Sequence, residues 1–187
     1  MNRRNIITRS AALTALPWLA LSAHHAALAE GDPQPAAVNP RVGAVAPMLM
    51  GRTMDKQSFD LSKDSKNVRL VSFWATWCPT CRVEMPDFRR AHEKWAKQGF
   101  DLVTVAIDKK FDDVMAYDSI IERTVPTTQR FSKLWRGASD YRDDFGPVLS
   151  TPTTYLIDRK QKIVGVFKGR VNEAQWAQIE WEVNKKV

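Results

Sequence analysis

Residues 73–86 read FWATWCPTCRVEMP, and this stretch contains the only two cysteines of the 187-residue chain. The cysteines are separated by two residues and lie between an apolar run and a segment with helical periodicity. A Cys-x-x-Cys pair in this setting is typical of redox proteins. Two thiols on the first turn of a helix can form a disulfide without a large movement of the backbone. The stretch therefore predicts a redox-active pair.

We expect the two cysteines to play different roles. Cys78 lies where the unpaired amides and the positive end of the helix dipole favour a thiolate. Lowering a thiol pKa from about 8.5 to about 7 raises the thiolate fraction at neutral pH from roughly 3% to roughly 50%. Cys81 lies one turn further into the helix and is less accessible. Cys78 is therefore the candidate nucleophile, and Cys81 is the candidate that resolves a mixed disulfide.

Zinc binding and an inert structural disulfide are two other uses of such a pair. A closed zinc site needs four ligands, but His24 and His25 lie in the N-terminal leader and His92 stands alone. A structural disulfide stabilises most when it closes a long loop, and this loop is very short. We favour redox chemistry and expect neither a resident metal nor a cofactor.

Three closely spaced methionines, Met48, Met50 and Met54, offer a further alternative. Thioethers at such spacing can bind Cu(I), but no cysteine or histidine joins them. Methionine as adaptable filler in a short strand explains the same pattern. A copper- or haem-handling module stays open as an alternative function.

Glu84 follows the cysteine pair on the predicted helix. Steps of three, four, three and four residues connect five positions on one helix face, namely Cys81, Glu84, Phe88, Ala91 and Trp95. The last three are apolar, so this face packs inward and takes the carboxyl group with it. Burial raises the pKa of an acid, which suits proton exchange with Cys81. The alternative is that Glu84 reaches solvent or pairs with Arg82.

The N-terminus has the pattern of an export signal. Three arginines precede an apolar core at residues 11–23, and small residues at 27–29 form a cleavage site. The apolar run is shorter than the roughly 20 residues that span a bilayer. We expect residues 1–29 to be a cleaved signal peptide and the protein to be periplasmic. The Arg3–Arg4 pair matches a twin-arginine signal only loosely.

Charge and length place limits on the remaining 158 residues. They contain 25 basic and 21 acidic side chains, because the leader holds three arginines and no acid. The basic residues are scattered among acidic ones, as on a solvated surface, so we expect no nucleic-acid partner. A chain of this length forms one domain.

The order of predicted elements indicates an α/β fold. Residues 30–47 are rich in Pro and Ala and form a predicted linker, and the domain follows at 48–187. Strands are expected at 68–74, at 100–107 and in a hairpin of 151–158 and 162–168, and helices after Cys78, at 112–123 and from Asn172. This order predicts a mixed sheet with helices on both faces. Residues 124–149 carry no clear pattern.

The chain resembles the thioredoxin-like thiol–disulfide oxidoreductases of the TlpA/ResA/DsbE type. Four pieces carry the resemblance, namely VGxxAP at 42–47, FWATWCPTC at 73–81, EMP at 84–86 and TPTTYLID at 151–158. They fall within residues 42–169, which is most of the mature chain. The family is exported, and it often reduces disulfides for cytochrome c maturation.

The resemblance implies roles for individual residues. It makes Cys78 the attacking thiol, Cys81 the resolver and Glu84 the acid of the active site. Pro152 is then a cis-proline facing the dithiol, and the Thr151 backbone is available to pair with an extended substrate strand. Trp77 and Pro79, on either side of Cys78, are expected to contact the substrate as well.

We therefore expect a periplasmic enzyme that reduces disulfides in cysteine-containing proteins, with apocytochrome c as one candidate substrate. A membrane thiol electron donor is expected to return the enzyme to its reduced state. A disulfide oxidase or isomerase is the alternative, because Thr80 occupies a place where the family often has Pro. Residues between the cysteines influence the redox potential. Gln161 stands where the family hairpin usually has Gly, and residues 124–150 match poorly, so that region is a candidate for substrate selection.

Overall fold

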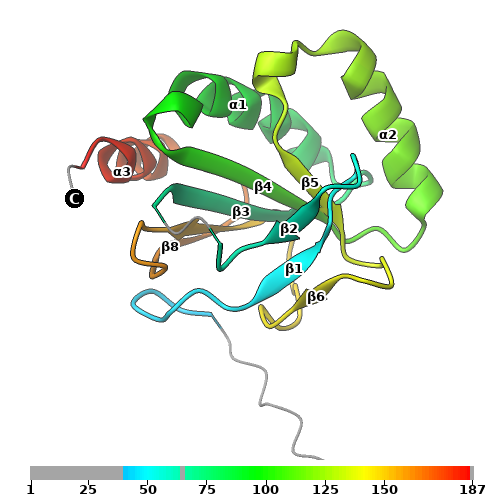
Figure 1. The fold of residues 1–187 in the computed structure, drawn as a ribbon. Helices are drawn as coiled ribbons and strands as arrows, with labels where there is room; N and C mark the ends of the chain where they lie inside the picture. The colour runs from blue at the N-terminus through cyan, green and yellow to red at the C-terminus, as the bar shows by residue number, and fades with distance from the viewer. Residues whose placement is uncertain (1–39, 64–65, 186–187) are drawn as a thin grey trace, which may run out of the picture. The chain divides into compact units, whose positions relative to one another are not determined.

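The computed structural model describes residues 40–63 and 66–185, so the predicted signal peptide and most of the predicted linker lie outside the described residues. Within this range the strands are β1 Leu49–Arg52, β2 Ser58–Asp60, β3 Val68–Trp74, β4 Phe100–Ala106, β5 Ser132–Trp135, β6 Arg142–Asp143, β7 Thr153–Ile157 and β8 Ile163–Lys168. The helices are α1 Pro79–Trp95, α2 Phe111–Thr124 and α3 Glu173–Asn184, with short 3-10 turns η1 Ala96–Gln98 and η2 Thr127–Gln129 (Figure 1).

A five-stranded mixed sheet forms the centre of the domain, in the order β5-β4-β3-β7-β8. Strand β3 lies in the middle, parallel to β4 and antiparallel to β7. All of its residues are buried, because both faces of the sheet are covered. The strands expected at 68–74 and 100–107, the hairpin, the helix at 112–123 and the helix after Asn172 are confirmed. Asn172 and Gln175 form the capping box that starts α3.

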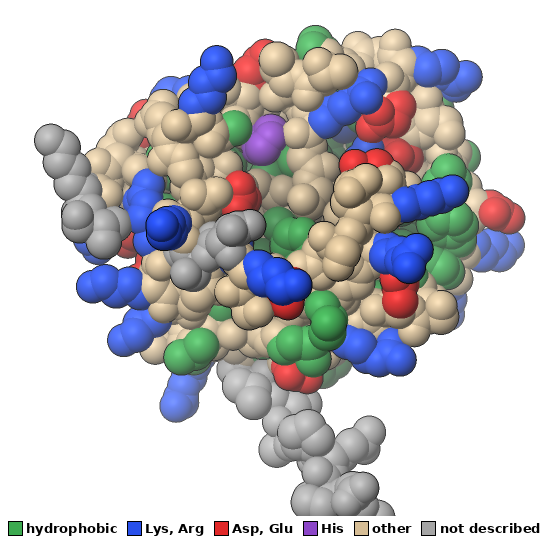
Figure 2. Space-filling view, viewed as in Figure 1, with side chains coloured by type: hydrophobic (Ala, Val, Ile, Leu, Met, Phe, Trp, Pro, Cys, Tyr) green, Lys and Arg blue, Asp and Glu red, His purple; other side chains and the backbone are tan. Residues whose placement is uncertain are grey.

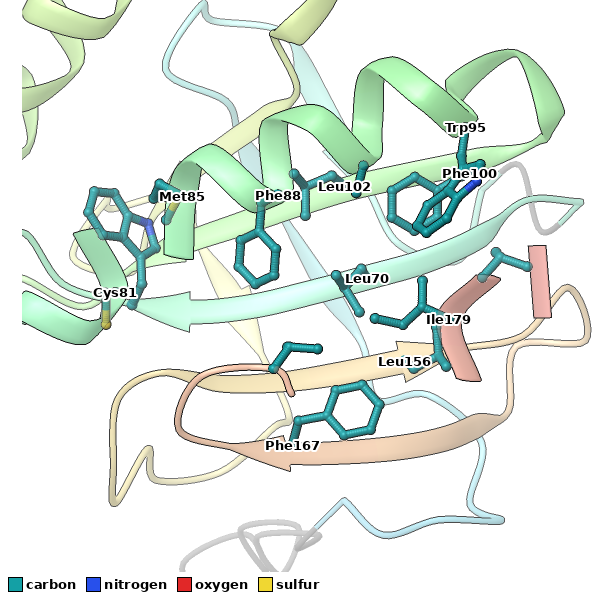
Figure 3. Packing of buried hydrophobic residues seen from close by; sticks show 14 of the residues in the cluster. Leu70, Cys81, Met85, Phe88, Trp95, Phe100, Leu102, Leu156, Phe167 and Ile179 are labelled. Atoms are coloured by element: carbon teal, nitrogen blue, oxygen red, sulfur yellow. The ribbon is translucent and has the colours of Figure 1, made fainter. Parts of the chain in front are cut away.

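All three helices contribute buried side chains to one face of the sheet. Phe88 and Trp95 of α1, Val114 of α2 and Ile179 of α3 belong to a single apolar cluster with Leu70 of β3. Figure 3 shows Phe88 and Trp95 extending from α1 towards the strands. The expected stripe at Cys81, Phe88 and Trp95 therefore packs inward as predicted.

The opposite face is covered by a three-stranded sheet, in the order β2-β1-β6, and by an aromatic cluster. The ring of Phe73 lies 5.2 Å from that of Phe145 and 6.0 Å from that of Tyr155, centroid to centroid. The placement of helices on both faces therefore differs from our expectation. The crossovers β3–α1–β4 and β4–α2–β5 step in the same direction, so right-handed connections place both helices on the same face.

The end of the predicted linker is attached to the hairpin. The backbone N–H of Ala46 donates to the carbonyl of Gln161 at 2.7 Å, and that of Gly43 donates to Ile163 at 2.8 Å. Gln161 adopts a positive φ of 60° at the hairpin turn, a conformation that glycine adopts with less strain. This explains why a glycine at this position would suit the turn. The methionine-rich segment 48–54 includes the short strand β1, as expected, but Met48 and Met50 are 41% and 43% exposed and do not fill a core.

Residues 124–149, which carried no clear sequence pattern, are ordered by polar contacts. The guanidinium of Arg136 donates to Asp143 at 2.8 and 2.9 Å and to the carbonyl of Gly146 at 2.6 Å. These contacts fold the segment after β5 back along β1, where β6 pairs with it.

None of the helices formed by the described residues is long and apolar enough to cross a bilayer.

Candidate active site

The turn between β3 and α1 places Cys78 at the N-cap of the helix. Its backbone is extended, with φ −85° and ψ 109°, and its Sγ accepts a hydrogen bond from the N–H of Cys81 at 3.1 Å. Pro79 occupies the first helical position, where a missing N–H costs nothing. Cys78 therefore lies at the positive end of α1, where a thiolate is favoured.

Cys78 and Cys81 form a disulfide, with their Cα atoms 5.3 Å apart. Both cysteines belong to the apolar cluster beneath α1, and Figure 3 shows Cys81 in it. The residues on either side of Cys78 differ, because Trp77 and Pro79 are exposed, Trp77 to 64%. Cys78 itself is 4% exposed.

Thr151 lies beside the dithiol, and the peptide bond between Thr151 and Pro152 is cis, as the family resemblance implied. The carbonyl oxygen of Thr151 lies 3.7 Å from Cys78 Sγ. The carbonyl of Pro152 accepts a hydrogen bond from the N–H of Gly169 at 2.8 Å. The loop before β7 is thereby tied to the loop after β8.

Glu84 lies inside the domain, where it is 1% exposed. Its Oε1 accepts a hydrogen bond from the N–H of Val171 at 2.6 Å, while Oε2 has no partner among the described residues. Burial raises the pKa of this carboxyl group to about 7, against the opposing effects of the Val171 N–H and the nearby Arg170. Arg170 itself pairs with Asp87 at 2.7 Å. The buried position predicted from the helix pattern is confirmed, and the alternative of pairing with Arg82 is not observed.

Asp108 holds the turn that precedes Cys78, and sequence reasoning missed it. This buried side chain follows β4 and accepts hydrogen bonds from the N–H of Thr76 at 3.1 Å and from its hydroxyl at 2.5 Å. The Asp108 carbonyl accepts a further bond from the indole of Trp135 at 2.8 Å. A signal was available, because Asp108 follows a buried strand at the sheet edge where ligands and catalytic groups gather.

The described residues contain no group of three or more side chains able to hold a metal ion. His92 packs edge-on against Phe131, with ring centroids 6.1 Å apart. The site thus contains the Cys78–Cys81 disulfide, the buried carboxyl group of Glu84 and the backbone carbonyl of Thr151. This arrangement can exchange disulfides and move a proton.

Comparison with known proteins agrees with this geometry. The profile of the Redoxin family matches residues 29–180. The thioredoxin-like protein YneN of Bacillus subtilis is 29% identical over 141 residues, 73% of this chain and 76% of that protein. The thiol:disulfide interchange protein DsbE of Pseudomonas aeruginosa is 37% identical over 112 residues, 58% of this chain and 57% of that protein.

A crystal structure described as a DsbE thiol:disulfide interchange protein of Chlorobium tepidum superposes with a TM-score of 0.64 at 27% identity, over 78% of this chain and 99% of that one. The thioredoxin-like α/β fold expected from the sequence is therefore confirmed.

The raised pKa of Glu84 makes the stability of the oxidised protein depend on pH. The pKa of this carboxyl group is about 7 in the folded protein, against the ordinary 4.5 expected in the unfolded chain. The protonated group therefore contributes its full stabilisation below pH 4.5, and this contribution is lost as pH rises through 7. The difference amounts to about 3 kcal/mol. Urea unfolding at pH 4 and pH 8 measures the free energy of unfolding at each pH. Between these two values the wild type should lose about 3 kcal/mol more of this free energy than Glu84→Gln. Parallel pH curves would contradict the assignment.

Proposed function

Because this chain belongs to the Redoxin family and is a thiol–disulfide oxidoreductase, we propose that it reduces disulfides in substrate proteins with Cys78 as the attacking thiol. The position of Cys78 at the N-cap of α1, with its sulfur beside the Thr151 carbonyl, supports this proposal most strongly. Cys81 is then the resolving thiol, because it lies one turn deeper in α1, while Cys78 is at the N-cap beside the exposed Trp77 and Pro79.

The proposed cycle conserves electrons and protons. The Cys78 thiolate attacks one sulfur of a substrate disulfide, and the other substrate sulfur leaves as a thiolate that takes up a proton. Cys81 then loses its proton and attacks Cys78 Sγ, which releases the second substrate thiol. The substrate gains two electrons and two protons, and the enzyme is left with the Cys78–Cys81 disulfide that the structure contains.

Glu84 is the proposed group that takes the proton from Cys81. The two side chains are one helical turn apart on the same face of α1, and both are buried. A carboxyl group with a pKa of about 7 is divided between its two protonation states near neutral pH, so it can both accept and return a proton. Its Oε2, which has no partner among the described residues, is available for this exchange.

The substrate chain is proposed to lie along the Thr151–Pro152 loop. An extended peptide can pair with the backbone of Thr151 while its cystine approaches Cys78. Trp77 and Pro79, which are both exposed, would flank the cystine on the side of α1. Pairing through the backbone fits an enzyme that acts on proteins of varied sequence.

The compartment and the electron donor are also part of the proposal. The export signal at residues 1–29 supports a periplasmic location. A dithiol there needs a donor that restores its reduced state, which we propose is a membrane thiol protein. The resemblance of residues 42–169 to the TlpA/ResA/DsbE type makes apocytochrome c one candidate substrate among cysteine-containing proteins.

The redox potential of the Cys78–Cys81 pair decides the direction of exchange. A reductant is expected to have a potential nearer to the roughly −270 mV of thioredoxin than to the roughly −120 mV of a strong oxidant. Equilibration of the full chain with glutathione or dithiothreitol mixtures gives this value. A potential near −120 mV would instead make the protein an oxidase, a difference of about 7 kcal/mol for two electrons.

The roles of the two cysteines can be separated with insulin as the substrate. Cys81→Ser is expected to accumulate a mixed disulfide between Cys78 and an insulin chain, because no second thiol remains to resolve it. Cys78→Ser, the matched control, is expected to trap none. Non-reducing electrophoresis and mass spectrometry identify the adduct and its position. Equal trapping by both variants would contradict the assignment of Cys78 as the nucleophile.

A further inference from the structure

A cavity with an open mouth lies between α1, α2, η2 and the sheet, away from the disulfide. Apolar side chains form most of its surface, among them Trp74, Met85, Val114, Ile121 and Phe131. Figure 2 shows a hollow between α1 and α2 with apolar side chains in its floor. The empty space amounts to about 490 Å³, its mouth included. The inner part is narrow and has room for only a few water molecules, which limits an occupant to a small or flat molecule.

Three basic side chains line this cavity, and two of them have carboxylate partners. The amine of Lys133 pairs with Asp118 at 2.6 Å and also with Glu122. The guanidinium of Arg130 pairs with the other oxygen of Glu122 at 2.9 Å. Both acidic side chains in the cavity are thus engaged by these two cations.

Arg89, the third basic side chain, has no carboxylate partner among the described residues. It is 8% exposed, and its one hydrogen bond is a donation to the hydroxyl of Tyr117 at 3.4 Å. The carboxylate of Glu93, one turn further along α1, accepts hydrogen bonds from Thr128 at 2.7 Å and from Gln129 at 2.8 Å and does not pair with Arg89. One positive charge in the cavity is therefore left uncompensated.

The Arg89 side chain is largely buried and lacks an anion. Partial loss of hydration is costly for a charged group when no opposite charge compensates it. Arginine cannot give up its proton to avoid this cost. Four of its five N–H donors remain available for a planar anion, and a carboxylate matches the guanidinium by two parallel hydrogen bonds.

We propose that this cavity binds a small monocarboxylate with an apolar body, of the size of butyrate or benzoate. The carboxylate pairs with Arg89, and the apolar part lies against Trp74, Val114 and Phe131. The single uncompensated charge selects a monoanion, and the apolar walls exclude phosphate and dicarboxylates. The site does not use the dithiol, so it does not depend on the proposed disulfide reduction.

Isothermal titration calorimetry of the full-length oxidised protein with benzoate and with butyrate tests the proposal. We expect saturable binding of one molecule per chain by at least one of them, about tenfold or more tighter for benzoate than for neutral benzyl alcohol, since hydrogen bonds to charged groups are the stronger ones. Arg89→Met is expected to abolish the preference for the acid. Arg90→Met removes the same charge from the exposed neighbouring position and is expected to leave binding unchanged.

A second variant keeps the test decisive if Arg89→Met does not fold. Ile121→Trp fills the cavity from α2 without altering any charge, and it is expected to abolish binding of both acids. Circular dichroism confirms that each variant is folded. Absence of saturable binding by both acids in the wild type would overturn the proposal. So would equal losses in Arg89→Met and Arg90→Met, or full binding by folded Ile121→Trp.

Discussion

The position of the first turn of α1 is the constraint on which the active site depends. Asp108 holds Thr76 just before the turn, Thr151 contacts the sulfur of Cys78, and Val171 binds the carboxyl group of Glu84. These contacts come from the segments after β4, before β7 and after β8. Strands β4 and β8 run parallel to β3 and β7 runs antiparallel, so all three segments lie at the edge of the sheet where β3 ends. The sheet order therefore brings distant parts of the chain to the start of one helix.

Helix α1 also carries two buried ionisable side chains that respond to burial in opposite ways. Glu84 can take up a proton, and its pKa of about 7 shows that burial brings the neutral form within reach. Arg89 has no carboxylate partner among the described residues, so its guanidinium needs an anion or water. Helix α1 thus combines, on two different faces, a group suited to proton transfer and a group suited to anion binding, five residues apart.

The fold and the centre of the site could be predicted because their signals are local. The Cys78–Cys81 spacing, the apolar runs of β3 and β4 and the capping box of α3 are each contained in a few consecutive residues. The parts that escaped prediction depend on contacts between distant residues. Asp108 binds Thr76 across 32 positions, and Arg136 folds its segment through Asp143 and a carbonyl. The helix placement was misjudged because it follows from strand order, which residue patterns do not encode.

The proposed disulfide exchange depends on a thiolate at the N-terminus of α1 that is more reactive than the second thiol of the pair. The pH dependence of iodoacetamide alkylation of the reduced protein, with each site quantified by mass spectrometry, tests this most directly. We expect Cys78 to react first, with a pKa well below the value of about 8.5 for a free thiol, and Cys81 to react slowly. Two thiols that react at equal rates and titrate together near 8.5 would contradict it.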